Sequence, residues 1–238
     1  EDKFFEKADK FALYPTEDDT YYTFEELKEK IKDLQTDKDD KLVVLYASDK
    51  EAQHSYIEAA KAKGFEVLLL DSPIVSHLMQ KLETSNDKLS FARVDADHLD
   101  NLIKKEDTQI SKLSDEEKEQ LKGNIEEVTK AKGYTIQLEA MDSEASPFII
   151  TEPEFMRRMK EMQQTGGGGM FGMGNMPEMY NLIVNINHPL VGEILGTKTA
   201  KKRDRLIKQS LDLARLSKGL LKGEELTKFI SRSYEMIK

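Results

Sequence analysis

The chain has 238 residues, of which 38% are hydrophobic and 34% are charged, and this allows one or two domains with a buried core. No apolar run approaches the roughly 18 residues of a membrane-spanning helix, and the absence of cysteine excludes disulfides, thiolate metal sites and cysteine nucleophiles. The net charge of −9 argues against a dedicated nucleic-acid-binding protein, because such proteins need Lys and Arg to neutralise phosphates.

Residues 1–105 are predicted to form a three-layer α/β domain around a short parallel sheet. The unbroken apolar run 42–47 has the composition of a strand that is covered on both faces, and 66–70, which is apolar after Glu66, is predicted to be the next buried strand. The more alternating run 89–94 is predicted to lie nearer an edge. Short strand–helix–strand links between these runs imply right-handed parallel crossovers.

Local signals predict the helices of this domain. Thr23 and Ser48 each precede a glutamate by three residues, which is the spacing of a capping box. Helices are therefore predicted to run from these positions to about Leu34 and Lys63. A third helix is predicted over residues 73–82.

The boundaries of the first domain carry weaker signals. The first twenty residues have no partner strands of their own in this prediction. Residues 104–120 contain almost no core-forming side chains, and Ser114 starts a charged helix that reaches about Lys132. Residues 106–133 are therefore predicted to be a connecting helix between two domains.

Residues 134–238 have the pattern of an α+β domain with a small, mainly antiparallel sheet. Strands are predicted over 134–138, 147–150 and 181–187, and the first of them has one polar face. A helix begins near Thr151, and a terminal helical hairpin closes the chain.

A glycine-rich run follows the helix that begins near Thr151. Gly167, Gly169 and Gly172 match the G-x-G-x-x-G spacing, but that motif needs a strand before it and a helix that opens on the phosphates. Here a helix precedes the glycines. The run is therefore predicted to be a flexible loop and not a nucleotide site.

Methionine is concentrated in and around this loop, and this side chain adapts to partners of varied shape. The helical methionines have two interpretations, a buried face or an exposed patch for partner chains. The loop methionines are harder to place in a core, because a glycine-rich segment does not hold them in fixed positions. The predicted partner-contacting residues are Phe155, Met156, Met159, Met162, Met170, Phe171, Met173 and Met176.

The two closing helices, over 199–216 and 224–237, carry apolar stripes. A hairpin this short packs one helix on the other and has apolar surface left over. Its own sheet could cover that surface, or the hairpin of a second copy could cover it as a four-helix bundle. The predicted homodimer-interface residues are Leu206, Ile207, Leu211, Ala214, Leu226, Phe229, Ile230 and Ile237.

Catalytic and metal-binding patterns are missing from the sequence. None of the four histidines has another histidine or a carboxylate motif at metal-ligand spacing, and there is no G-x-S-x-G elbow. No catalytic residue and no metal ligand is assigned, and this chain is predicted to perform no chemistry.

Three stretches of the chain, KLVVLYASDKEAQHSYIEAAKAKGFEVLLL with the DSPIVSHLMQKL after it, SPFIITEPEFMRRM and NINHPLV, carry the motifs of one known family. They resemble the heat-shock-protein-90 family of chaperones, and the bacterial HtpG-type members most of all. The late middle domain of that family resembles KLVVLYASDKEAQHSYIEAAKAKGFEVLLL and the DSPIVSHLMQKL that follows it. The segment SPFIITEPEFMRRM resembles a family strand that enters a methionine-bearing helix, and NINHPLV resembles a family element that contains His-Pro. The helices after Thr199 match the family's dimerisation helices, so the resemblance covers essentially the whole chain.

The resemblance implies a fragment of an ATP-driven chaperone that assists protein folding. Residues 1–105 would be the late middle domain, and 134–238 would be the C-terminal dimerisation domain. The implied partners are a second copy of the chain and partly folded client proteins, without nucleic acid or membrane, in the cytoplasm. Residue 1 is Glu, and ATP and magnesium are expected in a missing N-terminal domain of a longer parent. No cofactor and no ATP hydrolysis are expected in this chain itself.

Two other functions remain open on the residues alone. A flavodoxin-like ligand-binding domain fused to an oligomerisation module would have its site at the strand carboxyl ends, near Ser48 and Asp71. A nucleic-acid arm would use residues 198–238, whose net charge is +7. The charges there alternate with apolar residues, which is typical of solvated helix faces.

Overall fold

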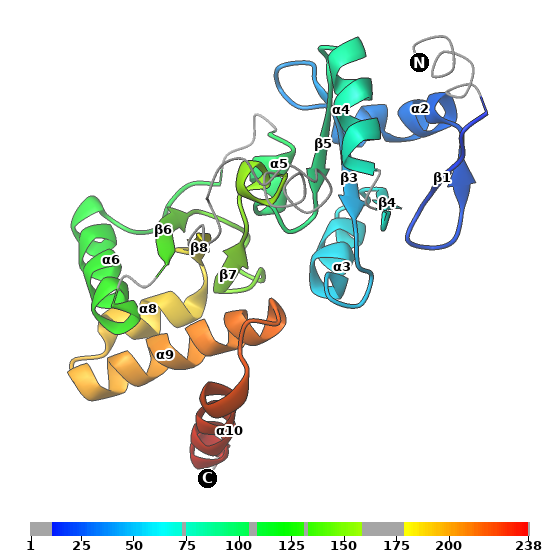
Figure 1. Ribbon diagram of the computed structural model, residues 1–238. Helices are drawn as coiled ribbons and strands as arrows, with labels where there is room; N and C mark the ends of the chain where they lie inside the picture. Colours follow the sequence, from blue (N-terminus) through cyan, green and yellow to red (C-terminus); the bar gives the residue numbers. More distant parts are fainter. Residues whose placement is uncertain (1–10, 73–74, 105–108, 131–132, 159–178, 238) are drawn as a thin grey trace, which may run out of the picture. The chain divides into compact units, whose positions relative to one another are not determined.

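The computed structural model groups the chain into two compact units (Figure 1). The structure describes residues 11–72, 75–104, 109–130, 133–158 and 179–237. Within these ranges, the first unit comprises 11–104 and 154–158, and the second comprises 109–153 and 179–237.

The first unit is built around a three-stranded parallel sheet, as predicted, with β3 in the centre. Its strands are β3 (Leu42–Ala47), β4 (Val67–Leu69) and β5 (Leu89–Arg93), in the order β4-β3-β5. Its helices are α2 (Phe24–Gln35), α3 (His54–Ala62), α4 (Val75–Ser85) and α5 (Leu99–Leu102).

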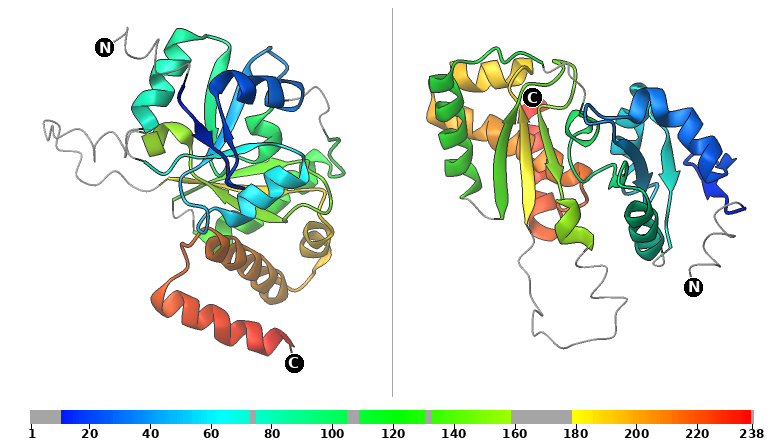
Figure 2. Two further views of the ribbon diagram at one scale, coloured as in Figure 1. Left: turned by 90° about the vertical axis from the view of Figure 1, so that its right-hand side faces the viewer. Right: turned by 90° about the horizontal axis from the view of Figure 1, so that it is seen from above.

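Helices cover both faces of this sheet, because successive side chains of a strand point to opposite sides. On one face, Val44 and Tyr46 of β3 pack with α2 and α4. On the other face, Val43 and Leu45 pack with α3 and α5 (Figure 2). An unbroken apolar run is therefore the pattern that this strand needs.

A small hairpin precedes α2, so the prediction that the first twenty residues have no partner strands is wrong. β1 (Tyr14–Pro15) pairs antiparallel with β2 (Tyr21–Tyr22), and Thr16 forms an isolated bridge with Leu68 of β4. Tyr14 is buried, with its ring centroid 5.4 Å from that of Phe24. Strands of two residues are too short to show an alternating pattern.

One of the two predicted capping boxes in this unit is confirmed. Thr23 caps α2 in a capping box with Glu26. The box at Ser48 is absent, and α3 begins only at His54. In its place the Gln53 side chain accepts hydrogen bonds from the backbone N–H groups of Ser48 and Asp49, at 2.8 and 3.0 Å.

The second unit combines a three-stranded sheet with four helices in the part of the chain that the structure describes. The strands are β6 (Tyr134–Glu139), β7 (Phe148–Thr151) and β8 (Tyr180–Asn185). The helices are α6 (Asp115–Thr129), α8 (Pro189–Gly196), α9 (Ala200–Ser217) and α10 (Gly223–Ile237). Helix α8 was not predicted.

The sheet of the second unit is mixed, which corrects the predicted antiparallel sheet. β8 lies between the other two strands and pairs parallel with β6 and antiparallel with β7. β6 and β7 run in opposite directions but are not neighbours, since β8 is inserted between them. Strand patterns predict that strands exist, but they do not predict which strand takes the central position.

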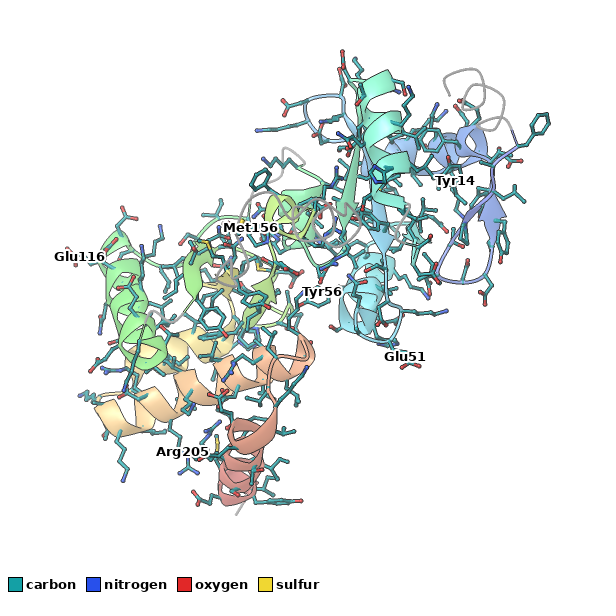
Figure 3. The ribbon with its side chains drawn as sticks, in the orientation of Figure 1. Tyr14, Glu51, Tyr56, Glu116, Met156 and Arg205 are labelled. Carbon is teal, nitrogen blue, oxygen red and sulfur yellow. The ribbon has the colours of Figure 1, made fainter. Side chains whose placement is uncertain are left out.

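Helix α6 belongs to the core of the second unit. Ser114 forms the predicted capping box with Glu117, and Leu121 and Ile125 are fully buried in the core of the second unit, where α6 packs on β6, α8 and α9. Its other face is charged, and Glu116 points away from the core (Figure 3). A helix with only two buried apolar positions resembles a solvated connector in sequence.

Candidate functional site

The helical residues 154–158 carry two of the predicted partner-contacting side chains. Phe155 is 70% exposed and Met156 is half-buried (Figure 3). The other six predicted residues, from Met159 to Met176, lie outside the described ranges, as does the glycine run. The role of these eight residues in contacting partner proteins therefore stays a prediction.

Polar side chains attach residues 154–158 to the sheet of the first unit. Arg157 is 3% exposed, and its guanidinium lies 5.5 Å from the centroid of the Tyr46 ring. Arg157 also donates to the Tyr46 hydroxyl and pairs with Glu154. The Tyr46 hydroxyl in turn donates to Glu154 Oε1 at 3.2 Å.

Arg158 extends this attachment to α4 and β5. Its guanidinium binds both carboxylate oxygens of Glu83, at 2.8 and 3.2 Å, and donates to the Phe91 carbonyl at 2.9 Å. Glu83 also accepts a hydrogen bond from the Phe91 backbone N–H at 2.7 Å. Arg158 Nε donates to Glu154 at 2.7 Å, so the two arginines share one carboxylate.

The charge balance keeps Glu154 ionised. Burial alone would raise its pKa, but the guanidiniums of Arg157 and Arg158 outweigh burial and lower the pKa below its ordinary value. For Arg158 the directions are reversed. Burial alone would lower its pKa, but its bonds to Glu83 and Glu154 outweigh burial and raise the pKa above its ordinary value.

The predicted dimer-interface residues separate into buried and exposed groups. Ile207, Leu211 and Ala214 of α9 are buried in the core of the second unit, and Phe229 of α10 is 7% exposed. Leu206 and Leu226 are half-buried, whereas Ile230 and Ile237 are exposed. Within a single chain, Ile230 and Ile237 are therefore the two of the eight predicted residues whose side chains are exposed and accessible to a partner.

Other apolar side chains on the same two helices are exposed, and the predicted interface did not include them. Leu213 and Leu216 lie one turn apart on α9, and Tyr234 and Met236 lie on α10. Tyr234 and Ile237 share one side of α10 with Ile230, at 100° per residue. The apolar spacing was visible in the sequence, but not which stripe the protomer itself would cover.

Charged and polar side chains, more than apolar ones, attach α10 to α9. Asp212 of α9 is 2% exposed and accepts from Arg232 at 2.6 Å, and it also pairs with Lys208 and Arg215. Gln209 bonds both Arg232 and Ser233, at 2.7 and 2.9 Å. Phe229 is the buried apolar side chain of α10.

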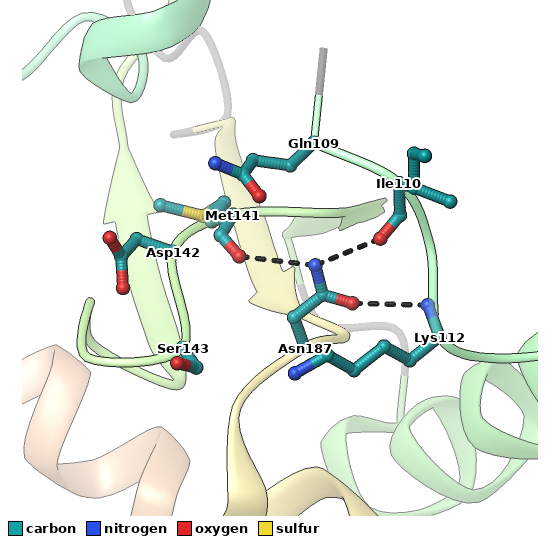
Figure 4. Close-up of a pocket in the computed structure, with 7 residues that line it drawn as sticks. All are labelled: Gln109, Ile110, Lys112, Met141, Asp142, Ser143 and Asn187. Atoms are coloured by element: carbon teal, nitrogen blue, oxygen red, sulfur yellow. Dashed lines mark hydrogen bonds between the residues drawn. The ribbon is translucent and has the colours of Figure 1, made fainter.

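The segment NINHPLV has a structural role in the second unit. Asn187 Nδ2 donates to the carbonyls of Ile110 and Met141, at 3.1 and 3.2 Å, and its Oδ1 accepts from the Lys112 N–H at 3.1 Å (Figure 4). These groups lie beside a pocket of about 500 Å³. His188 Nδ1 caps α8 by accepting from the Leu190 N–H at 3.0 Å. The Asn187 amide therefore joins two loops and has little capacity left for a ligand.

Among the described residues, the end of β3 at Ser48 does not offer the open cradle that a flavodoxin-like site needs. The backbone N–H of Ser48 is occupied by the Gln53 amide, whose Nε2 donates to Asp95 at 2.8 Å. Asp95 is 2% exposed and binds the Arg93 guanidinium. The described polar groups beside Ser48 satisfy one another, which disfavours a ligand site at this position, whereas Asp71 is exposed.

Metal sites and membrane-spanning helices are absent from the part of the chain that the structure describes. No group of three or more His, Cys, Asp or Glu side chains there could hold a metal ion. No helix in the same portion is long and apolar enough to cross a membrane.

Comparisons with known proteins agree on one family. A family model described as "Hsp90 protein" matches residues 9–238. Proteins named "Chaperone protein HtpG" or "Chaperone protein htpG" are 35% identical in Bacteroides fragilis (strain YCH46), 34% in Bacteroides thetaiotaomicron and 33% in Porphyromonas gingivalis (strain ATCC 33277). Each comparison covers 100% of this chain and 44% of the relative, so the chain spans less than half the length of these relatives. The family match and the resemblance of the residues agree: the chain belongs to the Hsp90 family of chaperones.

Proposed function

We propose that this chain provides homodimerisation and part of the client-binding surface of an Hsp90-family chaperone. Residues 1–105 would correspond to the late middle domain, with 106–133 leading into a C-terminal dimerisation domain over 134–238. The chaperone relatives and the apolar side chains left exposed on α9 and α10 support this function.

The exposed apolar side of α10 is the observation that carries the dimerisation proposal. Ile230, Tyr234 and Ile237 are 44%, 67% and 82% exposed and lie on one side of the helix. Soluble proteins seldom leave such a contiguous apolar surface without a partner. A second copy offers the same surface, and a twofold contact between identical faces closes on itself as a dimer.

Substitution of Ile230 by Asp tests this proposal. We expect Ile230→Asp to give a monomer of about 27.2 kDa by light scattering, because a carboxylate in an apolar interface is left desolvated. The matched control is Ile110→Asp, which makes the same change at an 86% exposed position of the same unit. A wild-type monomer, or a dimer that survives Ile230→Asp, would contradict the proposed contact.

The client-binding proposal depends on Phe155 and Met156. We expect Phe155→Ser to weaken binding of an unfolded probe, reduced and carboxymethylated lactalbumin, about ten-fold, since burial of an aromatic side chain is worth about 1.5–3 kcal/mol. Fluorescence anisotropy of the labelled probe measures this. Phe11→Ser is the control, at another phenylalanine that is 81% exposed. Equal affinities of the two variants would remove Phe155 from the client surface.

The mechanism that we propose is physical. Dimerisation would raise the effective concentration of the two ATPase domains of the full-length protein, so that their association becomes intramolecular. The methionines would offer adaptable apolar contacts to partly folded clients. ATP and magnesium would be bound by the full-length protein outside this chain, which itself would perform no chemistry, and the protein would act in the cytoplasm.

A further inference from the structure

Hydrogen bonds and ion pairs of polar side chains attach helical residues 154–158 to the first unit, whereas helices usually pack on sheets through apolar side chains. Neither apolar side chain of the segment is buried: Phe155 is 70% exposed and Met156 is half-buried. The buried member is Arg157, at 3%. Within residues 154–158, the contribution of hydrophobic burial, which usually holds a helix on a sheet, is therefore small.

The groups that hold the segment form one connected and neutral network. Two carboxylates, Glu83 and Glu154, face two guanidiniums, Arg157 and Arg158. Tyr46, 1% exposed in the central strand, bonds both Glu154 and Arg157. The bonds from Tyr46 and Glu83 to the segment join residues that are 75 to 111 positions apart in the chain.

The geometry of the network favours specificity of position over strength. Arg158 grips Glu83 with two parallel bonds, which fixes the orientation of the guanidinium as well as its distance. A buried charged network adds little net stability, because desolvation offsets the attraction. It does, however, penalise any position of the segment that leaves one of these charges unpaired.

We propose that Glu83, Glu154, Arg157, Arg158 and Tyr46 form a latch that holds residues 154–158 on the first unit and thereby presents Phe155 and Met156 to client proteins. This role rests on the client-binding function proposed above. The members of the latch are positioning residues, since the client would touch Phe155 and Met156. Opening the latch breaks polar bonds and uncovers no buried apolar side chain of the segment, so the latch can open while the sheet stays folded.

Tryptic cleavage after Arg157 and Arg158 reports the latch without any client. Glu83→Gln keeps one acceptor oxygen, replaces the other by an NH2 donor that cannot accept from Arg158, and removes the charge, whereas Tyr46→Phe removes the shared hydroxyl. Both variants leave the two cleavage sites intact in the full 238-residue chain. We expect cleavage at these two sites to be several-fold faster in each variant, and mass spectrometry of the fragments measures the rate. Glu29→Gln is the control, because Glu29 forms an exposed pair with Lys32 at 2.5 Å in the same unit.

Binding of the carboxymethylated lactalbumin probe to the same variants tests the presentation role. We expect Glu83→Gln to weaken binding several-fold, as Phe155→Ser does. We expect the melting temperatures of Glu83→Gln and Glu29→Gln to be similar, so that weaker binding does not reflect unfolding. Unchanged cleavage in the Glu83→Gln, Tyr46→Phe double variant would overturn the latch. Faster cleavage with unchanged binding would overturn its presentation role, while a loss of binding in Phe155→Ser would still support the proposed function. If Phe155→Ser also left binding unchanged, the client surface itself would be refuted.

Discussion

Single polar side chains decide several local structures that the apolar pattern does not specify. Gln53 takes the place of the predicted Ser48 cap, and its amide connects two backbone N–H groups to buried Asp95. Asn187 connects the loops at Ile110 and Met141. Such contacts depend on chain segments that meet only in the folded protein, so a single sequence carries no local signal for them.

Asn187 gives the clearest prediction at the scale of a residue. Asn187→Asp replaces two donated hydrogen bonds by a carboxylate that faces the carbonyls of Ile110 and Met141. We expect the free energy of unfolding of the second unit to fall by about 2–4 kcal/mol, since two buried acceptors lose their partner. Urea unfolding followed by circular dichroism measures this.

The same substitution at half-buried Asn181 serves as the control for Asn187→Asp. A loss at position 187 no larger than the loss at position 181 would show that the amide does not hold the two loops together.

At the scale of elements, periodicity predicted most helices and strands but not their partners. The parallel strands of the first unit, the caps of α2 and α6 and the closing helices were all predicted. The position of β8 between β6 and β7 was not, because strand order depends on long-range pairing. Nor did the pattern show that Ile207 and Leu211 would be covered by their own unit.

The charged attachment of α10 to α9 leads to a prediction for this pair of helices. Arg232→Met removes the 2.6 Å bond to buried Asp212 and the bond to Gln209. We expect α10 to detach more readily, at a cost of about 2 kcal/mol, because a hydrogen bond to a charged group contributes about that much. Hydrogen exchange of the α10 amides would therefore be faster.

Lys228→Met is the matched control for Arg232→Met, since Lys228 pairs on the surface with Glu224 of the same helix. Equal exchange rates in the two variants would show that the Asp212 network does not hold α10.

At the scale of the whole molecule, the first unit is discontinuous in sequence. Residues 154–158 group with residues 11–104, although they follow a strand of the second unit. The sequence pattern predicts consecutive domains, and the helix near Thr151 was therefore predicted to belong to the C-terminal domain. The arginines and glutamate that reverse this assignment look like ordinary surface charges in the sequence.

Dipolar spectroscopy can detect directly whether two chains meet through α10, as proposed. The chain has no cysteine, so a spin label on Ser231→Cys, at an exposed position of α10, is the single label in each molecule. If two chains meet through α10, the labelled protein gives an intermolecular dipolar signal at micromolar concentration, and this signal disappears when Ile230→Asp is also present. Absence of that signal in a folded chain with an intact Ile230 would contradict the proposed contact.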